Sequence, residues 1–179
     1  HNYLVKDIND LENTIAEGFY VARTGRPGPV VIDLPKDIQN SVTNFKAIKV
    51  NSMNSYKPVK KEKLNNIKLA IDILLKAKKP IIYSGGGVIN SGVKASSILT
   101  KLVNYLNVPI TQTLMGLGAV SAENKNFLGM LGMHGTYEAN MAMHDCDVML
   151  CVGARFDDRI TGNLKYFSPN SKKIHIDID

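Results

Sequence analysis

Apolar residues recur along the first forty positions with the period of a helix and then with that of a strand. Asn9 and Glu12 are spaced as a capping box that would open the helix. Glycine and proline over 25–29 end it, and the apolar run at 30–34 predicts a short strand. The apolar face of the predicted helix consists of Leu11, Ile15, Phe19 and Ala22.

Beyond residue 60, apolar runs of strand length alternate with helical patterns. One helix over 64–75 precedes the first of these strands, a second follows the glycines at 85–87, and a third spans 136–144. The alternation predicts an α/β fold, a Rossmann-like doubly wound parallel sheet with helices on both faces. The second helix should turn inward Ile98, Leu99, Leu102, Val103 and Leu106. The predicted strands cover 80–83, 108–113, 127–131, 147–152 and 173–179.

The segment 40–58 between these two regions follows neither period. Its mixture of polar and apolar residues is typical of a connector, so we expect the domain boundary there. The first forty residues would then be a helix-and-strand remnant of a second α/β domain.

The unusual residues of the second region come directly after its predicted strands. Right-handed crossovers bring the carboxyl ends of parallel strands to one edge of the sheet, where open α/β sheets bind ligands. Glycine at such positions lets the backbone approach a ligand closely. The sequence therefore predicts a nucleotide-shaped binding site at this edge. The segments concerned are 85–87, 113–116, 132–135, 153–159 and Asp177.

Each of these signals has a plainer alternative. The glycines at 85–87 are not a G-x-G-x-x-G fingerprint and lack an acid about 20 residues on, so they suit a tight turn as well as a diphosphate. Asp177 would bind ribose hydroxyls or cap a turn, and His134 would contact a ligand or serve the structure. Arg155 and Arg159 would neutralise a diphosphate or form surface ion pairs. Core filling is the alternative for Met115, Met130, Met133, Met141 and Met143.

Composition and charge exclude several classes of function. The 179 residues carry a net charge of +6, but lysine is spread along the chain and no nucleic-acid motif accompanies it, so we expect no nucleic-acid partner. The densest group of lysines, at 57–63, is interpreted as a solvated linker. No apolar run reaches the roughly 18 residues of a membrane span. Cys146 and Cys151 lack metal-ligand spacing, which favours buried thiols in a reducing cytoplasm and no metal site.

Four segments together resemble the acetolactate synthase (acetohydroxyacid synthase) large-subunit family. The first, TGRPGPVVIDLPKD at 24–37, is shared by many thiamine diphosphate (ThDP) enzymes that act on 2-oxo acids. More specific to the family are GMHGTYEAN at 132–140 and GARFDDR at 153–159, and TLMGLG at 113–118 precedes them in the right order. The resemblance covers essentially the whole chain.

This resemblance implies a domain plan and an activity. Residues 1–40 would end a ThDP pyrimidine-binding domain, 41–60 would be a linker, and 61–179 would form most of a central FAD-binding domain, incomplete at its carboxyl end. The parent enzyme would use ThDP, Mg²⁺ and FAD to condense two pyruvates to 2-acetolactate and CO₂, or pyruvate with 2-oxobutyrate, in branched-chain amino acid biosynthesis. It would work as a homodimer or homotetramer, with a possible regulatory small subunit, in the cytoplasm.

The resemblance also assigns roles to individual residues. The catalytic glutamate and the Gly-Asp-Gly motif for Mg²⁺ would lie outside this chain, so we expect no catalytic or metal-binding residue within it and no activity from it alone. FAD contacts are implied at Arg26, Gly85, Gly86, Gly87, Thr113, Leu114, Met115, Gly132, Met133, His134, Gly153, Arg155, Asp157, Arg159, Asp177 and Ile178.

Two other hypotheses remain open at this point. The chain could be the central domain of another ThDP enzyme, such as pyruvate oxidase, glyoxylate carboligase or oxalyl-CoA decarboxylase, although the segment 153–159 argues against these. Alternatively, it could be a stand-alone nucleotide-binding or electron-transfer module, or a purely structural fragment.

Overall fold

The computed structural model describes residues 1–178, which fall into two compact units. The first comprises His1–Lys61 together with Ile178, and the second comprises Glu62–Asp177. Asp179, which the sequence places in the last strand, lies outside the described residues.

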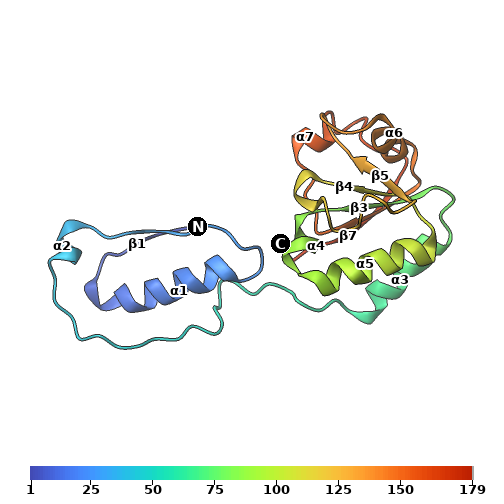
Figure 1. Cartoon of the computed structure of the whole chain (residues 1–179). Helices are drawn as coiled ribbons and strands as arrows, with labels where there is room; N and C mark the ends of the chain where they lie inside the picture. Colours follow the sequence, from blue (N-terminus) through green and yellow to red (C-terminus); the bar gives the residue numbers. More distant parts are fainter. Residues whose placement is uncertain (179) are drawn as a thin grey trace. The chain divides into compact units, whose positions relative to one another are not determined.

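The first unit is a small α/β arrangement. Strand β1 pairs in parallel with β2, with Tyr3 opposite Ile32, and the helix between them gives a strand–helix–strand crossover (Figure 1). Strand β1 and helix α2 were not predicted, because elements of three and four residues are too short to show a period. The elements are β1 (Asn2–Leu4), the 3-10 helix η1 (Ile8–Asp10), α1 (Leu11–Arg23), β2 (Val31–Asp33) and α2 (Lys36–Gln39).

The predicted capping box at the start of the first helix is wrong. Asp10 is the N-cap residue of α1, and its side chain makes no capping hydrogen bond. The Asp7 side chain instead accepts the N–H of Asn9 at 2.9 Å and caps η1, which precedes the helix. The extra 3-10 turn moves the start of α1 to Leu11, so Glu12 is too close to the helix start for the reciprocal bond that a capping box needs.

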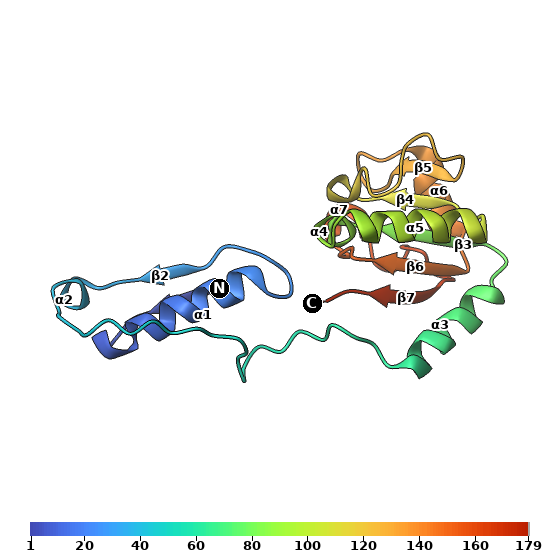
Figure 2. The same cartoon turned by 60° about the horizontal axis from the view of Figure 1, so that its bottom comes forward.

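The second unit contains a five-stranded parallel sheet with the strand order β5-β4-β3-β6-β7. Its first strand in sequence, β3, lies at the centre, and the chain builds outward from it first on one side and then on the other (Figure 2). This confirms the predicted doubly wound sheet. The strands are β3 (Pro80–Ser84), β4 (Ile110–Gln112), β5 (Phe127–Met130), β6 (Val148–Val152) and β7 (Lys172–Ile176).

Helices cover both faces of this sheet, with α3 and α5 on one side and α6 on the other (Figures 1 and 2). Thr136 caps α6 by accepting the N–H of Ala139 at 3.2 Å. The helices are α3 (Leu64–Leu75), α4 (Gly86–Asn90), α5 (Val93–Leu106), α6 (Tyr137–Asp145) and α7 (Asp158–Thr161), with the 3-10 helix η2 at Leu114–Gly116.

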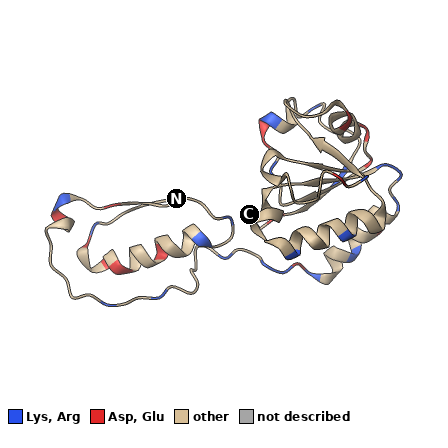
Figure 3. Ribbon diagram, viewed as in Figure 1, with Lys and Arg blue, Asp and Glu red and all other residues tan. Residues whose placement is uncertain are grey.

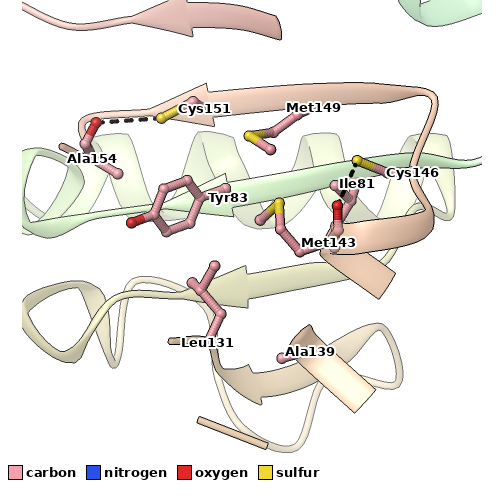
Figure 4. Packing of buried hydrophobic residues seen from close by; sticks show 9 residues of the cluster. All are labelled: Ile81, Tyr83, Leu131, Ala139, Met143, Cys146, Met149, Cys151 and Ala154. Atoms are coloured by element: carbon pink, nitrogen blue, oxygen red, sulfur yellow. Dashed lines mark hydrogen bonds between the residues drawn. The ribbon is translucent and has the colours of Figure 1, made fainter. Parts of the chain in front are cut away.

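The two faces of the sheet carry separate cores. Alternate residues of a strand point to opposite faces, so Ile81 and Tyr83 of β3 pack with α6, while Ile82 packs with α5. The α6-side core is shown in Figure 4 and contains both cysteines. Its buried members are Ile81, Tyr83, Leu131, Ala139, Met143, Cys146, Met149, Cys151 and Ala154.

The predicted helix after the triple glycine is two helices, α4 and α5, separated by Ser91 and Gly92. Leu99 and Val103 of α5 are buried as expected, but Ile98 is 56% exposed and does not point inward. The apolar stripe is thus narrower than predicted, because a helix on an open sheet buries only one side.

The charged residues do not gather on one element of the fold (Figure 3). Lysine and arginine are scattered over helices, loops and the connector (Figure 3). Within residues 1–178, no helix is both long enough and apolar enough to cross a membrane.

Candidate functional site

The strand order creates a switch point between β3 and β6 in the second unit. From this point the chain winds outward in both directions, so the loops after β3 and β6 leave toward opposite faces of the sheet. Ligands of open α/β sheets bind at the carboxyl end of such a switch point. The loops there begin at Gly85 and Gly153, the first residues after the two strands.

The loops after β3 and β6 touch through their backbones. The Gly85 N–H donates to Val152 O at 2.9 Å, and the Gly87 N–H donates to Gly153 O at 2.9 Å. A Cβ on Gly85 would lie 2.3 Å from Gly153 O and 2.5 Å from Ala154 Cα. Because backbone atoms cannot yield as a flexible side chain can, Gly85 has to be glycine for the two loops to meet.

The loop after β4 joins the same edge from the other side of β3. The Thr113 N–H donates to Ser84 O at 2.9 Å, which ties this loop to the end of β3. The Thr113 hydroxyl accepts the Gly116 N–H at 3.0 Å and caps η2. Met115 approaches Gly86, where an added Cβ would lie 3.1 Å from Met115 Cβ, yet 76% of its surface is exposed.

The loop after β5 carries Gly132, Met133 and His134. The Met133 N–H donates to Arg159 O at 3.1 Å, so this loop contacts the start of α7. Met133 is 65% exposed, and His134 is also exposed. Core filling is therefore wrong for Met115, Met133 and Met141, all of which are exposed, and right for Met143, which is buried.

The loop after β6 is held by the core and by the end of β7. The Tyr83 hydroxyl donates to Arg155 O at 3.1 Å from within the α6-side core. Arg155 lies 3.8 Å from Asp157 as a surface ion pair. The Gly153 N–H donates to Ile176 O at 2.8 Å.

The end of β7 brings a further acid to this edge. His175 Nε2 lies 3.0 Å from Ala154 O and 3.6 Å from Asp177 Oδ2. The side chain of Asp157 accepts the Arg159 N–H at 3.1 Å and caps α7. Asp157, Asp177 and His175 thus already interact with other groups of the protein. These interactions would hold the two carboxylates in one orientation when a ligand binds.

Two buried polar atoms at the strand ends have no hydrogen-bond partner within the described residues. They are Ser84 Oγ at the end of β3 and Gln112 Oε1 at the end of β4. Buried polar atoms are usually paired, and both lie below the loops that the sequence assigns to cofactor binding. A bound polar ligand is one physical reason for such a pair, so the strand ends fit a nucleotide cofactor.

The buried ionisable groups of the core have the properties of structural residues and not of catalytic ones. Burial raises the pKa of Cys151 to about 12, and burial likewise raises the pKa of Cys146 and of the Tyr83 hydroxyl. Cys151 donates to Ala154 O and Cys146 to Met143 O, as Figure 4 shows. Among residues 1–178, no group of three His, Cys, Asp or Glu is placed to hold a metal ion.

Two hollows in the second unit lie away from the predicted cofactor residues. One of about 210 Å³ lies between α6 and the segment 160–168. The other, of about 560 Å³, lies at the amino edge of the sheet around Lys78, Lys79 and Cys146. The close glycine contacts and the unpartnered atoms of Ser84 and Gln112 lie at the carboxyl edge, which makes that edge, and neither hollow, the candidate site.

Two residues of the predicted set fall outside the second unit. Arg26 lies in an exposed turn of the first unit, where the Tyr56 hydroxyl donates to Thr24 O at 2.8 Å. Ile178 also belongs to the first unit. The structure brings the other predicted residues together at the carboxyl edge of one sheet.

Four residues that shape this edge are not among the predicted FAD contacts, although the predicted segment 113–116 includes Gly116. Gly116 lies against the end of β3, because a Cβ there would lie 2.7 Å from Ser84 O. Ser84 and Gln112 are polar residues at the ends of apolar strands, and that contrast was the available signal. Asn140 pairs with the backbone of Gly132 and was visible as the last residue of the motif at 132–140.

Several known proteins are similar to this chain over its full length. An acetolactate synthase large subunit from Buchnera aphidicola subsp. Schlechtendalia chinensis is 51% identical over 182 residues. One from Haemophilus influenzae is 49% identical, and an acetolactate synthase isozyme 3 large subunit from Escherichia coli is 48% identical. In each case the match covers 100% of this chain and 31% of the relative, so the chain spans about a third of their length.

The family model for the central domain of thiamine pyrophosphate enzymes matches residues 67–179. The matched segment contains the whole five-stranded sheet and the loops at its carboxyl edge. The resemblance found in the four motifs is thereby confirmed, and the chain belongs to the thiamine pyrophosphate enzyme family through this central domain.

Proposed function

We propose that this chain is part of an acetolactate synthase large subunit. The complete polypeptide would join two pyruvates into 2-acetolactate with loss of CO₂, or pyruvate to 2-oxobutyrate. The proposal is supported by relatives of that name that match the chain along its full length. The central-domain family of ThDP enzymes supports the same class of reaction.

The second unit would bind FAD at the carboxyl edge of its sheet. The single observation that carries this assignment is the convergence of the loops after β3, β4, β6 and β7, linked by the backbone hydrogen bonds of Thr113, Gly87 and Gly153. The glycines would let the cofactor approach the backbone closely. Arg155 and Arg159 would offset the charge of its diphosphate, and Asp177 would accept hydrogen bonds from its ribose.

The exposed methionines fit an apolar part of the same ligand. Met115 and Met133 project from neighbouring loops with most of their surface in solvent. Sulfur and methylene groups pack well against aromatic rings, so these side chains would contact the flavin and lose their exposure on binding. FAD would have a structural part in the site, with no net electron transfer.

The remaining components of the reaction would come from other parts of the polypeptide. ThDP would supply the decarboxylation and carbon–carbon bond formation, with Mg²⁺ holding its diphosphate. Burial raises the pKa of Cys146, Cys151 and Tyr83, so these three groups do not suit proton transfer at neutral pH. The 179-residue chain alone should therefore form no acetolactate from pyruvate.

The assembly and location follow the same resemblance. The word "large" in the names of the relatives supports a small regulatory partner, and a homodimer or homotetramer would form the active enzyme. Unpaired buried thiols at Cys146 and Cys151 fit a reducing compartment, and we place the enzyme in the cytoplasm.

The direct test is an acetolactate assay on the complete polypeptide with ThDP, Mg²⁺ and FAD each left out in turn. We expect product only when all three are present. Activity without added or bound FAD would overturn the flavin assignment and leave the carboligase assignment standing. Peroxide or acetyl phosphate from pyruvate would instead identify an oxidase of the same fold.

A further inference from the structure

The side chain of Asn140, on helix α6, reaches back to the backbone of Gly132. The Gly132 N–H donates to Asn140 Oδ1 at 2.9 Å, and Asn140 Nδ2 donates to Gly132 O at 3.1 Å. A single side chain thus satisfies both backbone groups of one residue. An amide that does so takes the place of a neighbouring strand, since it offers the same donor and acceptor as a peptide group.

Gly132 is at a position where such a partner is needed. It follows β5, an edge strand of the sheet, so β4 is the only strand beside it within the described residues. Asn140 Nδ2 also donates to Thr136 O at 3.1 Å, which fixes the orientation of the amide. The amide oxygen and both amide protons of Asn140 are therefore hydrogen-bonded, and these bonds fix the orientation of its side chain on α6.

The other side of Gly132 is held by the start of α7. Gly132 has φ +100°, and a Cβ there would lie 2.9 Å from Arg159 O. The next residue, Met133, donates its N–H to that same oxygen at 3.1 Å. The backbone at Gly132 therefore runs between the Asn140 amide and the Arg159 carbonyl.

We infer that Asn140 is a positioning residue that fixes the direction in which Met133 and His134 leave the sheet. Within the described residues its side chain hydrogen-bonds to Gly132 and Thr136 and to neither Met133 nor His134. It sets the backbone from which they project and keeps that backbone against Arg159. The inference rests on the proposed function only in that the ligand of these residues would be FAD.

The test compares Asn140→Ala with a matched control in the complete polypeptide. Asn104→Ala, on the exposed side of α5, removes a helical asparagine whose Oδ1 accepts from Asn124 Nδ2 at 2.9 Å. Both variants lose an asparagine with hydrogen bonds, but only Asn140 contacts the loop after β5. Asn140→Asp is the second variant, which keeps the acceptor for Gly132 and loses the donor.

Amide hydrogen exchange of the ligand-free protein tests the positioning itself. We expect the Gly132 and Met133 amides of Asn140→Ala to exchange about tenfold faster than in the wild type, the effect of losing two net hydrogen bonds. In Asn140→Asp the Gly132 amide should stay within about twofold of the wild type, because its acceptor remains. Unchanged exchange in Asn140→Ala, or equal acceleration in Asn104→Ala, would overturn the inference.

FAD titration then connects the positioning to the ligand. Asn140→Ala should bind FAD about tenfold more weakly than Asn104→Ala, because the loop must be reordered on binding. Equal affinities would overturn the part of the inference that concerns Met133 and His134 as ligand contacts. If the wild-type protein binds no FAD, the proposed cofactor fails, and the exchange rates alone decide whether Asn140 positions the loop.

Discussion

The two edges of the parallel sheet, at the amino and the carboxyl ends of its strands, differ in how their polar groups are paired. At the amino edge, the Asp147 carboxylate accepts the N–H groups of Lys78 and Lys79 at 2.7 and 2.9 Å. Asp147 also donates its own N–H to Lys79 O at 3.2 Å and accepts the Lys172 N–H at 2.8 Å. Through its side chain and its backbone, Asp147 thereby joins the starts of β3, β6 and β7 with hydrogen bonds internal to the protein.

The carboxyl edge is left incomplete by comparison. Glycines bring its loops into backbone contact, Ser84 and Gln112 keep a buried polar atom without a partner in the described chain, and Met115 and Met133 face solvent. Internal hydrogen bonds account for the strand starts that Asp147 joins, and Asn126 Nδ2, before β5, is the buried polar atom at the amino edge without a partner in the described chain. At the carboxyl edge, the unpartnered polar atoms and the exposed methionines have no explanation in contacts within the described chain. Such groups are expected at an edge that binds a ligand.

The largest expected effect comes from filling the contact between the loops after β3 and β6. Gly85→Ala should lower the free energy of unfolding by about 3 kcal/mol, because its Cβ would strike backbone atoms of Gly153 and Ala154. Chemical denaturation of the complete polypeptide measures the loss. Gly28→Ala, whose Cβ would meet nothing within 4 Å, is the control and should change stability by less than about 0.5 kcal/mol. Equal losses would mean that the loops are not in contact.

A second effect should separate stability from ligand binding. Met115→Ala should leave the free energy of unfolding within about 0.5 kcal/mol of the wild type but weaken FAD binding about tenfold, since an exposed side chain would become buried on binding. Tyr105→Ala removes a side chain that is 88% exposed near the amino edge, and should change neither quantity. Flavin fluorescence titration measures the FAD affinity, and thermal melts measure the stability. Equal FAD affinities would remove Met115 from the site.

The amino edge should respond to pH and not to FAD. Backbone hydrogen bonds, chiefly from Lys78, lower the pKa of Asp147 below its ordinary value. Its contribution to stability is then complete above about pH 4 and is lost as the pH falls through the pKa of the folded state. Asp147→Asn should therefore make the midpoint of thermal unfolding less dependent on pH below about 4.

The control for this pH dependence is Asp72→Asn on the exposed side of α3, which should leave the slope unchanged. FAD affinity at neutral pH should equal that of the wild type in both variants. A slope in Asp147→Asn as steep as in the wild type would show that the carboxylate does not stabilise the amino edge.

The smallest expected effect concerns the two buried thiols. Alkylation needs the thiolate, and burial raises the pKa of Cys151 to about 12 and also raises that of Cys146. Iodoacetamide at pH 8 should modify neither cysteine in the native protein and both in urea, as intact mass spectrometry would show. Modification of Cys151 in the native protein would mean that the strand ends open more often than their hydrogen bonds suggest.

Much of this edge could be predicted from the sequence, because its signals are local. A glycine run such as 85–87 after an apolar strand, and the motif at 153–159, are visible without the fold, and the alternation of runs gave the parallel sheet. Features that depend on atoms far apart in sequence could not be predicted. Asn140 shows its role only when α6 places it beside Gly132, and Asp147 only when β3 begins next to it.

The errors have the same origin. Asn9 and Glu12 have the spacing of a capping box, but the preceding 3-10 turn, capped by Asp7, moved the helix start. Ile98 fits the helical period, and only the width of the contact between α5 and the sheet decides that it stays exposed. Periodicity finds an element, whereas its ends and the limits of its buried face depend on neighbours.

The central claim is that the carboxyl edge of the sheet holds FAD, and equilibrium titration tests it most directly. The complete wild-type polypeptide would be titrated with FAD beside Gly86→Val, whose larger side chain would crowd Met115 at that edge. The account predicts saturable binding of one FAD per chain in the wild type and clearly weaker binding in a Gly86→Val protein that still melts cooperatively. Equal affinity in the two proteins, or no FAD binding by the wild type, would contradict it.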